Sequence, residues 1–296
     1  MKDYLLVLLS VVLLAASFML QKLYQKKTVS DPRNGVKFSL FSAVISLLLL
    51  FFTGGMQLQF SWYSIGNAAL RALAGFLYTL LGFRILKRGN VALYMLFLMS
   101  GGMLVPCVWG WLFLGEAVTP LRAAGVVVIL ASIVLSNSGL KRPDTRLLLL
   151  CVAVFFLNGA VSVLSKLHQA NTTYPVAGTN SYAIYGTLAS LLMSSGTQVV
   201  STVRERKKEA VKPPAGLGIR LLPLLLVLPY SAVCTTSSVL QLEGARNLPA
   251  SVLYPMITGG SIALSGVFAR ICFKEKLSLR EWAGIVLCLG GTCLFL

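Results

Sequence analysis

Residues 91–130, VALYMLFLMSGGMLVPCVWGWLFLGEAVTPLRAAGVVVIL, return in pattern as residues 250–289, ASVLYPMITGGSIALSGVFARICFKEKLSLREWAGIVLCL. The two stretches align without a gap, so that Gly101 falls on Gly260 and Glu116 on Glu275. A fixed internal period indicates that one supersecondary unit was duplicated. When such a unit spans a membrane, duplication is the usual plan of secondary transporters, which hold their substrate where the copies meet.

The composition is that of an integral membrane protein. Hydrophobic residues make up 56% of the 296 residues, charged residues only 12%, and the mean hydropathy is +0.81. A soluble chain of this length exposes far more charge. The net charge of +17 comes from residues between apolar stretches rather than from a basic stripe, so we expect no nucleic-acid partner. One histidine and six cysteines without metal-ligand spacing predict neither a metal site nor a cofactor.

Ten stretches are apolar and long enough to cross a bilayer, which takes about 20 residues in a helix. The predicted spans are Tyr4–Leu20, Val36–Thr53, Ser64–Phe83, Val91–Leu114, Pro120–Ser136, Leu147–Ser165, Asn180–Val200, Ile219–Leu240, Ala250–Phe273 and Leu279–Leu296.

A polar break around Lys141–Asp144 divides these spans into two sets of five. Because five is odd, the second set enters the membrane the opposite way up, as in the inverted repeats of many transporters. The predicted fold is therefore an all-α polytopic membrane protein of ten transmembrane helices in two inverted five-helix repeats. Residues 1–140 form the first repeat and residues 141–296 the second, within one compact membrane domain.

Lysine and arginine in short loops stay in the cytoplasm and so predict the orientation. The odd-numbered connections hold 20 of the 26 basic residues. We therefore expect a multi-pass protein of the cell (plasma) membrane with these connections in the cytoplasm and both termini outside.

Acidic residues are absent from the middle of every predicted span, which argues against a proton or cation trap built on a mid-membrane carboxylate. An enzyme is not expected either, because no span carries a nucleophile beside a base. The only histidine, His168, is predicted to lie in the loop after the sixth span and to face water.

Arg71 is the most suggestive charge, since it interrupts the third span on the side predicted to be outside. Burying a charge in a membrane costs several kcal/mol unless a partner neutralises it. One interpretation is an anchor for a substrate carboxylate or phosphate, or a gate pair with Glu116 or Glu243. The other is a side chain near the membrane boundary that reaches the interface.

Small residues interrupt the fourth and ninth spans at the same repeat position, Gly101 and Gly102 in one and Gly259, Gly260 and Ser261 in the other. Paired interruptions of this kind point to a central site, although helix packing explains them equally well. Polar side chains predicted near this site complete the set of substrate-pathway candidates, which are Arg71, Tyr94, Gly101, Gly102, Asn158, Tyr230, Tyr254, Gly259, Gly260 and Ser261.

Three segments resemble EamA-type transporters of the drug/metabolite transporter superfamily: WLFLGEAVTPLRAAGVVVILASIVL, RICFKEKLSLREWAGIVLCLGGTCLFL and RALAGFLYTLLGFRILKRGNVALYML. The resemblance implies ten helices in two inverted repeats around a cavity lined chiefly by the first, third, fourth, sixth, eighth and ninth helices. Such relatives are often exporters coupled to protons, or exchangers, and many are drawn with cytoplasmic termini. An arginine often opens their third helix, which favours the boundary interpretation of Arg71.

The leading hypothesis is a secondary transporter that exports or exchanges a small polar or amphiphilic metabolite or drug by alternating access. A flippase for a lipid-linked headgroup and a non-transporting membrane sensor or assembly subunit are the alternatives. The expected partners are a small-molecule substrate, membrane lipids and a proton or other coupling ion.

Overall fold

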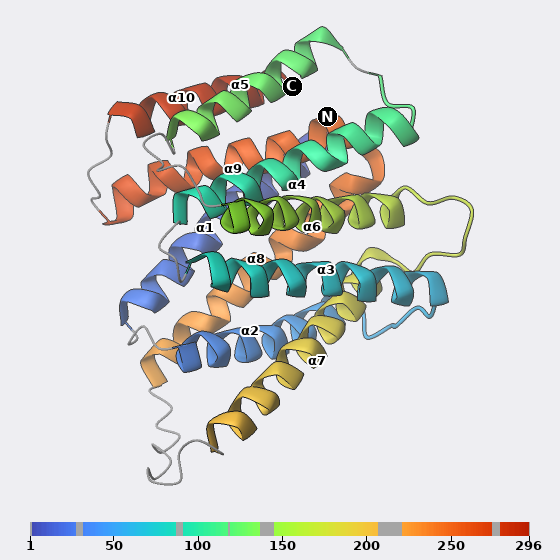
Figure 1. Cartoon of the computed structure of the whole chain (residues 1–296). Helices are drawn as coiled ribbons and strands as arrows, with labels where there is room; N and C mark the ends of the chain where they lie inside the picture. The colour runs from blue at the N-terminus through green and yellow to red at the C-terminus, as the bar shows by residue number, and fades with distance from the viewer. Residues whose placement is uncertain are drawn as a thin grey trace.

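A computed structural model describes residues 2–27, 32–86, 91–117, 119–136, 145–206, 221–273 and 279–295. Within these ranges the chain forms ten α-helices and no strand (Figure 1). Their bounds are α1 Lys2–Lys27, α2 Pro32–Thr53, α3 Trp62–Leu86, α4 Val91–Phe113, α5 Pro120–Ser136, α6 Thr145–Gln169, α7 Thr179–Arg206, α8 Leu221–Asn247, α9 Ala250–Phe273 and α10 Leu279–Cys293.

Each predicted span contains the greater part of one helix, and α5 and α9 begin and end where the sequence predicts. Proline sets several of these starts, because its fixed φ suits the first helical turn and its missing N–H is not needed there. Pro32 opens α2 and Pro120 opens α5. At the other end of α2, Gly55 has a φ of 66°, a conformation that glycine adopts without strain and that ends the helix.

The helices are apolar enough to place the chain in a membrane. Six of them, α1, α3, α4, α6, α8 and α9, are long and apolar enough to cross a bilayer in the described part of the chain. Shorter apolar stretches fall in α2, α5 and α10. The protein is therefore a multi-pass membrane protein. Half of the 20 basic residues that predict its orientation lie outside the described residues, as does the predicted break Lys141–Asp144.

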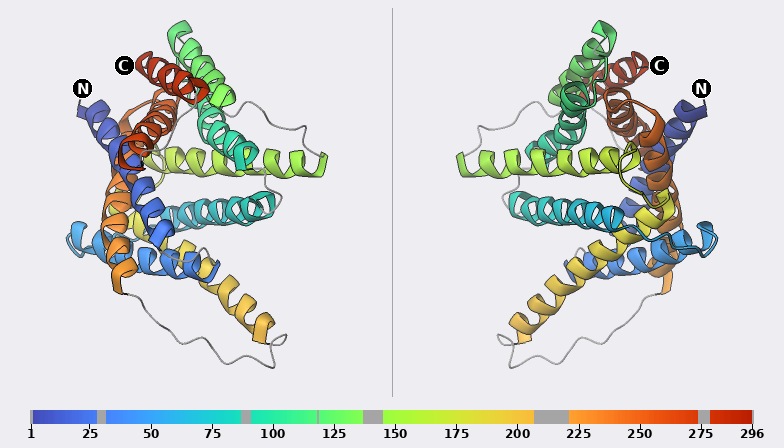
Figure 2. Two further views of the ribbon diagram at one scale, coloured as in Figure 1. Left: turned by 90° about the vertical axis from the view of Figure 1, so that its left-hand side faces the viewer. Right: turned by 90° about the vertical axis from the view of Figure 1, so that its right-hand side faces the viewer.

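The best-buried helix is α9, of which 59% of the most apolar window is buried inside the protein. It packs against α1, α4 and α10 and belongs to the largest hydrophobic cluster. By contrast, α7 starts beside α3 and then runs away from it, as all views show (Figures 1 and 2). The molecule is thus tightly packed around α9 and more open between α3 and α7.

His168 corrects one expectation, because it is not a loop residue that faces water. The sixth helix continues to Gln169, so His168 lies in its last turn, and the side chain is 1% exposed. Its Nε2 lies 2.8 Å from Ser64 Oγ on α3, and its ring stacks on Tyr182 at 3.7 Å between centroids. The span was predicted too short because Lys166 and His168 suggested a polar loop, whereas both are buried by neighbouring helices.

Candidate functional site

A cavity of about 410 Å³ lies between α2, α3, α6, α7 and α8. This volume falls within the range of about 300–1,000 Å³ that is usual for small-molecule sites. The lining residues follow helical spacing, since they recur every three or four positions and therefore share one face of each helix. On α3 they include Arg71, Gly75 and Thr79, and on α7 they include Gly186, Thr187, Ser190 and Ser194.

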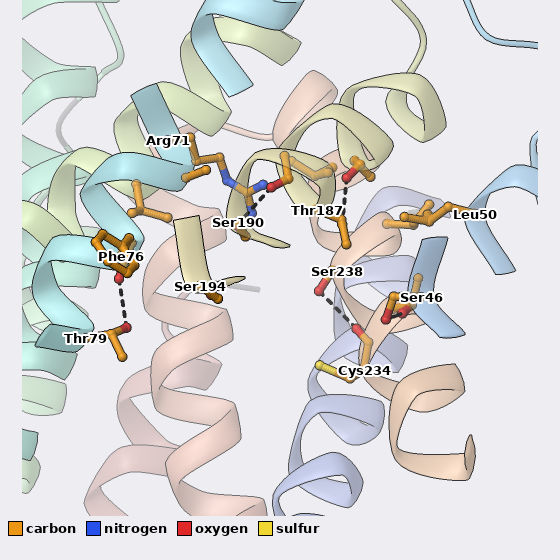
Figure 3. Close-up of a pocket in the computed structure, with 18 of the residues that line it drawn as sticks. Ser46, Leu50, Arg71, Phe76, Thr79, Thr187, Ser190, Ser194, Cys234 and Ser238 are labelled. Atoms are coloured by element: carbon orange, nitrogen blue, oxygen red, sulfur yellow. Dashed lines mark hydrogen bonds between the residues drawn. The ribbon is translucent and has the colours of Figure 1, made fainter. Parts of the chain in front are cut away.

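Arg71 is the one charged side chain among the lining residues of this cavity. Figure 3 shows its guanidinium directed toward the part of α7 that carries Thr187 and Ser190. The guanidinium carbon lies 5.8 Å from the centre of the Tyr182 ring. Gly186 lets it approach α7, because a Cβ added there lies 3.3 Å from Nη1 of Arg71. The side chain therefore turns into the cavity, and its Nε is buried without a hydrogen-bond partner.

Hydroxyl groups supply most of the remaining polarity of the cavity. Thr187 Oγ1 and Ser190 Oγ donate hydrogen bonds to the carbonyls of Ala183 and Gly186, each at 2.8 Å. Thr79 Oγ1 does the same toward Gly75 on α3. A hydroxyl that donates its proton to the preceding helical turn keeps its lone pairs for another partner. The cavity wall therefore offers acceptors as well as the Arg71 cation.

A stack of rings closes the cavity toward the start of α3 and α7. Tyr182 contacts both the Arg71 guanidinium and the His168 ring, and Tyr63 also stacks on His168, at 6.1 Å between centroids. The Tyr182 hydroxyl donates a 2.8 Å hydrogen bond to Asn67 Oδ1, which fixes the ring. Tyr182 and His168 are both at most 1% exposed, so this part of the stack is buried inside the protein.

Hydrogen bonds between the two halves of the chain reinforce the same end. Gln59, in the α2–α3 connection, donates from its backbone N to Ser181 Oγ at 3.1 Å and accepts from Gly178 N at 2.6 Å. Its carbonyl also accepts a bond from Tyr185 Oη at 2.8 Å. Ser61 Oγ donates to the Pro175 carbonyl at 2.6 Å. This end of the bundle is closed in the structure.

Of the ten residues predicted for the pathway, Arg71 lines the cavity and the other nine do not. Gly101 lies against α6, where a Cβ added to it meets the Phe155 carbonyl oxygen. Gly102 lies beside Asn158, whose Nδ2 donates a 2.7 Å bond to the Leu98 carbonyl on α4. These three residues join α4 to α6.

The ninth-helix candidates also lie in helix contacts. A Cβ on Gly259 comes within 2.5 Å of Thr292 Oγ1 on α10, and one on Gly260 within 2.8 Å of Val11 Cγ1 on α1. Ser261 is buried and donates to the Thr258 carbonyl. Tyr254 reaches across to α6, where its hydroxyl donates to the Ser162 carbonyl.

The two remaining tyrosines pack in separate clusters. Tyr94 is buried with Ile85 and Leu147, near the ends of α3 and α6 that lie away from the closed end. Tyr230 packs against Phe38, with 4.6 Å between ring centroids. The structure thus gathers Gly101, Gly102 and Asn158 at one helix contact and does not bring the ten candidates together around one hollow.

Sequence reasoning missed the lining residues of α7 and α8. The signal for them was present, because small and hydroxyl residues recur at positions 183, 186, 187, 190 and 194. On α8, the small and hydroxyl residues Cys234, Thr235 and Ser238 form a shorter series of the same kind. A polar stripe at helical period on a membrane helix marks the face that avoids lipid.

Comparison with known proteins agrees with the architecture. Residues 1–138 match the model of the EamA-like transporter family. A solved crystal structure of a protein resembles the fold with a TM-score of 0.73 at 16% sequence identity, covering 99% of this chain and 96% of that chain.

A curated relative matches over a shorter stretch. It is named "Probable 4-amino-4-deoxy-L-arabinose-phosphoundecaprenol flippase subunit ArnE", from Pseudomonas fluorescens (strain Pf0-1), and is 37% identical over 49 residues. The match covers 17% of this chain and 42% of the relative. The resemblance noted in the sequence is thereby confirmed for the first half of the chain: residues 1–138 of this membrane protein form an EamA-like transporter domain.

Proposed function

We propose that the chain is a secondary transporter that exports or exchanges a small polar or amphiphilic metabolite or drug across the cell membrane by alternating access. The observation that carries this proposal is the Arg71 cavity. Its walls come from α2 and α3 in the first half of the chain and from α6, α7 and α8 in the second. A site shared by two halves can be exposed to either side when the halves rock against each other.

The packing of the helices supports an inverted relation between two five-helix repeats. In the first half, α1 packs against α8 and α9 of the second half. The corresponding helix of the second half, α6, packs against α3 and α4 of the first. Gly101 and Gly260, which share a repeat position, follow this pattern, since Gly101 lies against α6 and Gly260 against α1.

The closed end supports alternating access. There, bonds such as Ser61 to Pro175 and Tyr185 to Gln59 join the two halves. The charge rule predicts that this end faces outside, because the basic residues Arg84, Arg146 and Arg204 lie at the opposite ends of α3, α6 and α7. The structure then corresponds to a state closed toward the outside, and transport requires these bonds to break.

Reconstitution of the full chain into liposomes with a metabolite panel tests the proposal. Thr187→Trp fills the cavity from α7, whereas Leu192→Trp places the same ring on the same helix at a side chain that is 73% exposed. We expect Thr187→Trp to abolish flux and Leu192→Trp to leave it within about twofold of the parent. Flux that survives Thr187→Trp places the pathway elsewhere, and a parent chain that moves no solute overturns the proposal.

A second candidate is a flippase for a lipid-linked headgroup, and the flippase name of the curated relative favours it. Such a function needs a path from the lipid into the cavity. Movement of a headgroup-labelled polyprenyl phosphate between leaflets, blocked by Thr187→Trp, supports the flippase. Movement of water-soluble metabolites alone supports the metabolite transporter.

A further inference from the structure

We infer that the substrate carries an anionic group, a carboxylate or a phosphate, which pairs with the guanidinium of Arg71. This inference deepens the proposed function and rests on it. It starts from the position of Arg71, which is too far along α3 for a residue that merely marks the membrane boundary. The helix begins at Trp62, and the guanidinium turns into the cavity beside Gly186 (Figure 3).

The positive charge of Arg71 has no carboxylate partner in the described part of the chain. No carboxylate lines the cavity. Glu116, proposed as a gate partner, is instead bound to the start of α9, with both carboxylate oxygens accepting hydrogen bonds there. Asp3 accepts a 3.0 Å bond from Asn247. A cation at membrane depth is costly without a counter-charge, so an arriving anion gains most of its binding free energy here.

The contact with Tyr182 leaves the hydrogen-bonding edge of the guanidinium available. The guanidinium carbon of Arg71 lies over the Tyr182 ring, 5.8 Å from its centroid, in a cation–π arrangement that uses none of the N–H donors of the guanidinium as a conventional hydrogen bond. The five N–H donors point outward in the guanidinium plane, and Nε is among them, buried and without a partner. A planar fork of donors fits a carboxylate or a phosphate through two parallel hydrogen bonds.

The hydroxyl groups extend the description of the substrate. Thr79, Thr187 and Ser190 each donate to their own helix and keep acceptor capacity toward the cavity. A substrate that carries an anionic group as well as hydroxyl or amino donors can bind Arg71 through the anion and these hydroxyl oxygens through its donors. Cationic solutes meet a single positive charge and no carboxylate, so the cavity repels them.

Two sources can present this chemistry, a water-soluble organic anion and the phosphate of a lipid-linked headgroup. Both place a negative group beside Arg71. Thiol labelling tests the charge of the cavity without any substrate, and ligand binding separates the two sources.

Thiol labelling measures the charge of the cavity directly. Ser190→Cys places a thiol in the region toward which Arg71 points, in a chain whose Cys234, Cys272 and Cys293 are replaced by serine (Figure 3). Rates with an anionic and a cationic methanethiosulfonate are normalised to their rates with a small free thiol. We expect the anionic reagent to be favoured several-fold and Arg71→Gln to remove this preference. Equal normalised rates with Arg71 present overturn the inference.

Ligand binding by the full chain in lipid nanodiscs gives the second measurement. The panel pairs carboxylates with their amides and phosphate monoesters with their alcohols, and includes a short polyprenyl phosphate. We expect only the anions to raise the unfolding temperature, an effect lost in Arg71→Gln and kept in part in Arg71→Lys. Arg84→Gln, the same charge change on an exposed residue of α3, serves as the control and should bind as the parent does.

The outcomes separate this inference from the proposed function. Binding of anions without flux supports the anion site and contradicts transport. Flux of neutral or cationic solutes that Thr187→Trp blocks and Arg71→Gln spares supports transport and overturns the anion site. Stabilisation by polyprenyl phosphate alone assigns the anion to a lipid, and stabilisation by soluble anions alone assigns it to a metabolite.

Discussion

Glu116 and Lys166 hold opposite sides of the turn that joins α8 to α9. The Glu116 carboxylate accepts hydrogen bonds from the backbone N–H groups of Ala250 at 2.6 Å and Ser251 at 3.0 Å, the first residues of α9. Lys166 Nζ donates to the carbonyls of Ala245 at 3.0 Å and Leu248 at 2.6 Å, at the end of α8. A negative group at a helix start and a positive group at a helix end both interact favourably with the helix dipole.

This arrangement gives both charges a structural role, and for Glu116 it replaces the gate pair with Arg71 that the sequence suggests. Glu116 comes from the α4–α5 connection and Lys166 from α6, so the turn is fixed by two elements distant in the sequence. The glutamate also explains Gly110, because a Cβ there lies 2.6 Å from Glu116 Oε2. The buried helix α9 thereby acquires a fixed starting point.

We expect Glu116→Ala to lower the free energy of unfolding by about 1–2 kcal/mol, the usual cost of losing a helix N-cap. Glu116→Gln keeps one side-chain acceptor, so its free energy of unfolding should fall by about half as much. Gly110→Ala is an independent route to the same site and should also destabilise the protein, because its methyl group displaces the carboxylate. Denaturant unfolding in detergent micelles measures all three. Wild-type stability of Glu116→Ala contradicts the capping role.

Replacing Lys166 by methionine should cost about 1–3 kcal/mol, since two carbonyl acceptors at the end of α8 lose their donor. Lys166→Arg should not restore stability, because the ammonium site is only 6% exposed and a guanidinium is larger. In the double variant that combines Lys166→Met with Glu116→Gln, the loss of unfolding free energy should differ from the sum of the two single losses by about 0.5 kcal/mol or more, as for residues that act on one structural element. Strict additivity indicates two independent sites.

The position of the helices followed from the sequence more completely than the position of the site. The prediction for Ala250–Phe273 agrees with α9 at both ends because a long apolar run marks them. For Gly101 and Gly260 the sequence leaves two explanations open, a central hollow or a close approach of two helix backbones. The pattern of one helix does not say which of these explanations applies, because that depends on the opposing helix.

A packed glycine of α4 and an open glycine of α3 test the packing role directly. Gly101→Ala should lower the free energy of unfolding by about 1–3 kcal/mol through overpacking, because its Cβ meets the Phe155 backbone. Gly66→Ala, in the interior of α3, is the matched control, since nothing lies within 4 Å of its Cβ. There the change should be neutral or stabilising by up to about 1 kcal/mol, because alanine favours helix. Similar effects at both positions contradict the packing role of Gly101.

Tyr182 separates Arg71 from the closed end, and we expect its removal to open a route into the cavity. Tyr182→Ala deletes the ring that stacks on His168 at 3.7 Å and the hydroxyl bonded to Asn67 at 2.8 Å. The thiol introduced by Ser190→Cys should then react several-fold faster with an impermeant reagent added outside intact cells. Tyr94→Ala removes a buried ring of the same size away from the cavity and should leave the rate unchanged.

The side of the membrane from which Tyr182→Ala accelerates thiol labelling also tests the orientation of the protein. If the closed end faces outward, as the positive charges predict, external reagent reacts faster with Tyr182→Ala cells, and reagent applied to inside-out vesicles gains little. Acceleration only in inside-out vesicles reverses the topology while keeping the stack as a barrier. Equal acceleration by Tyr94→Ala means that lost stability, rather than an opened path, exposes the thiol. The ring stack then has no gating role, and access to Arg71 depends on the hydrogen bonds of Gln59 and Ser61 instead.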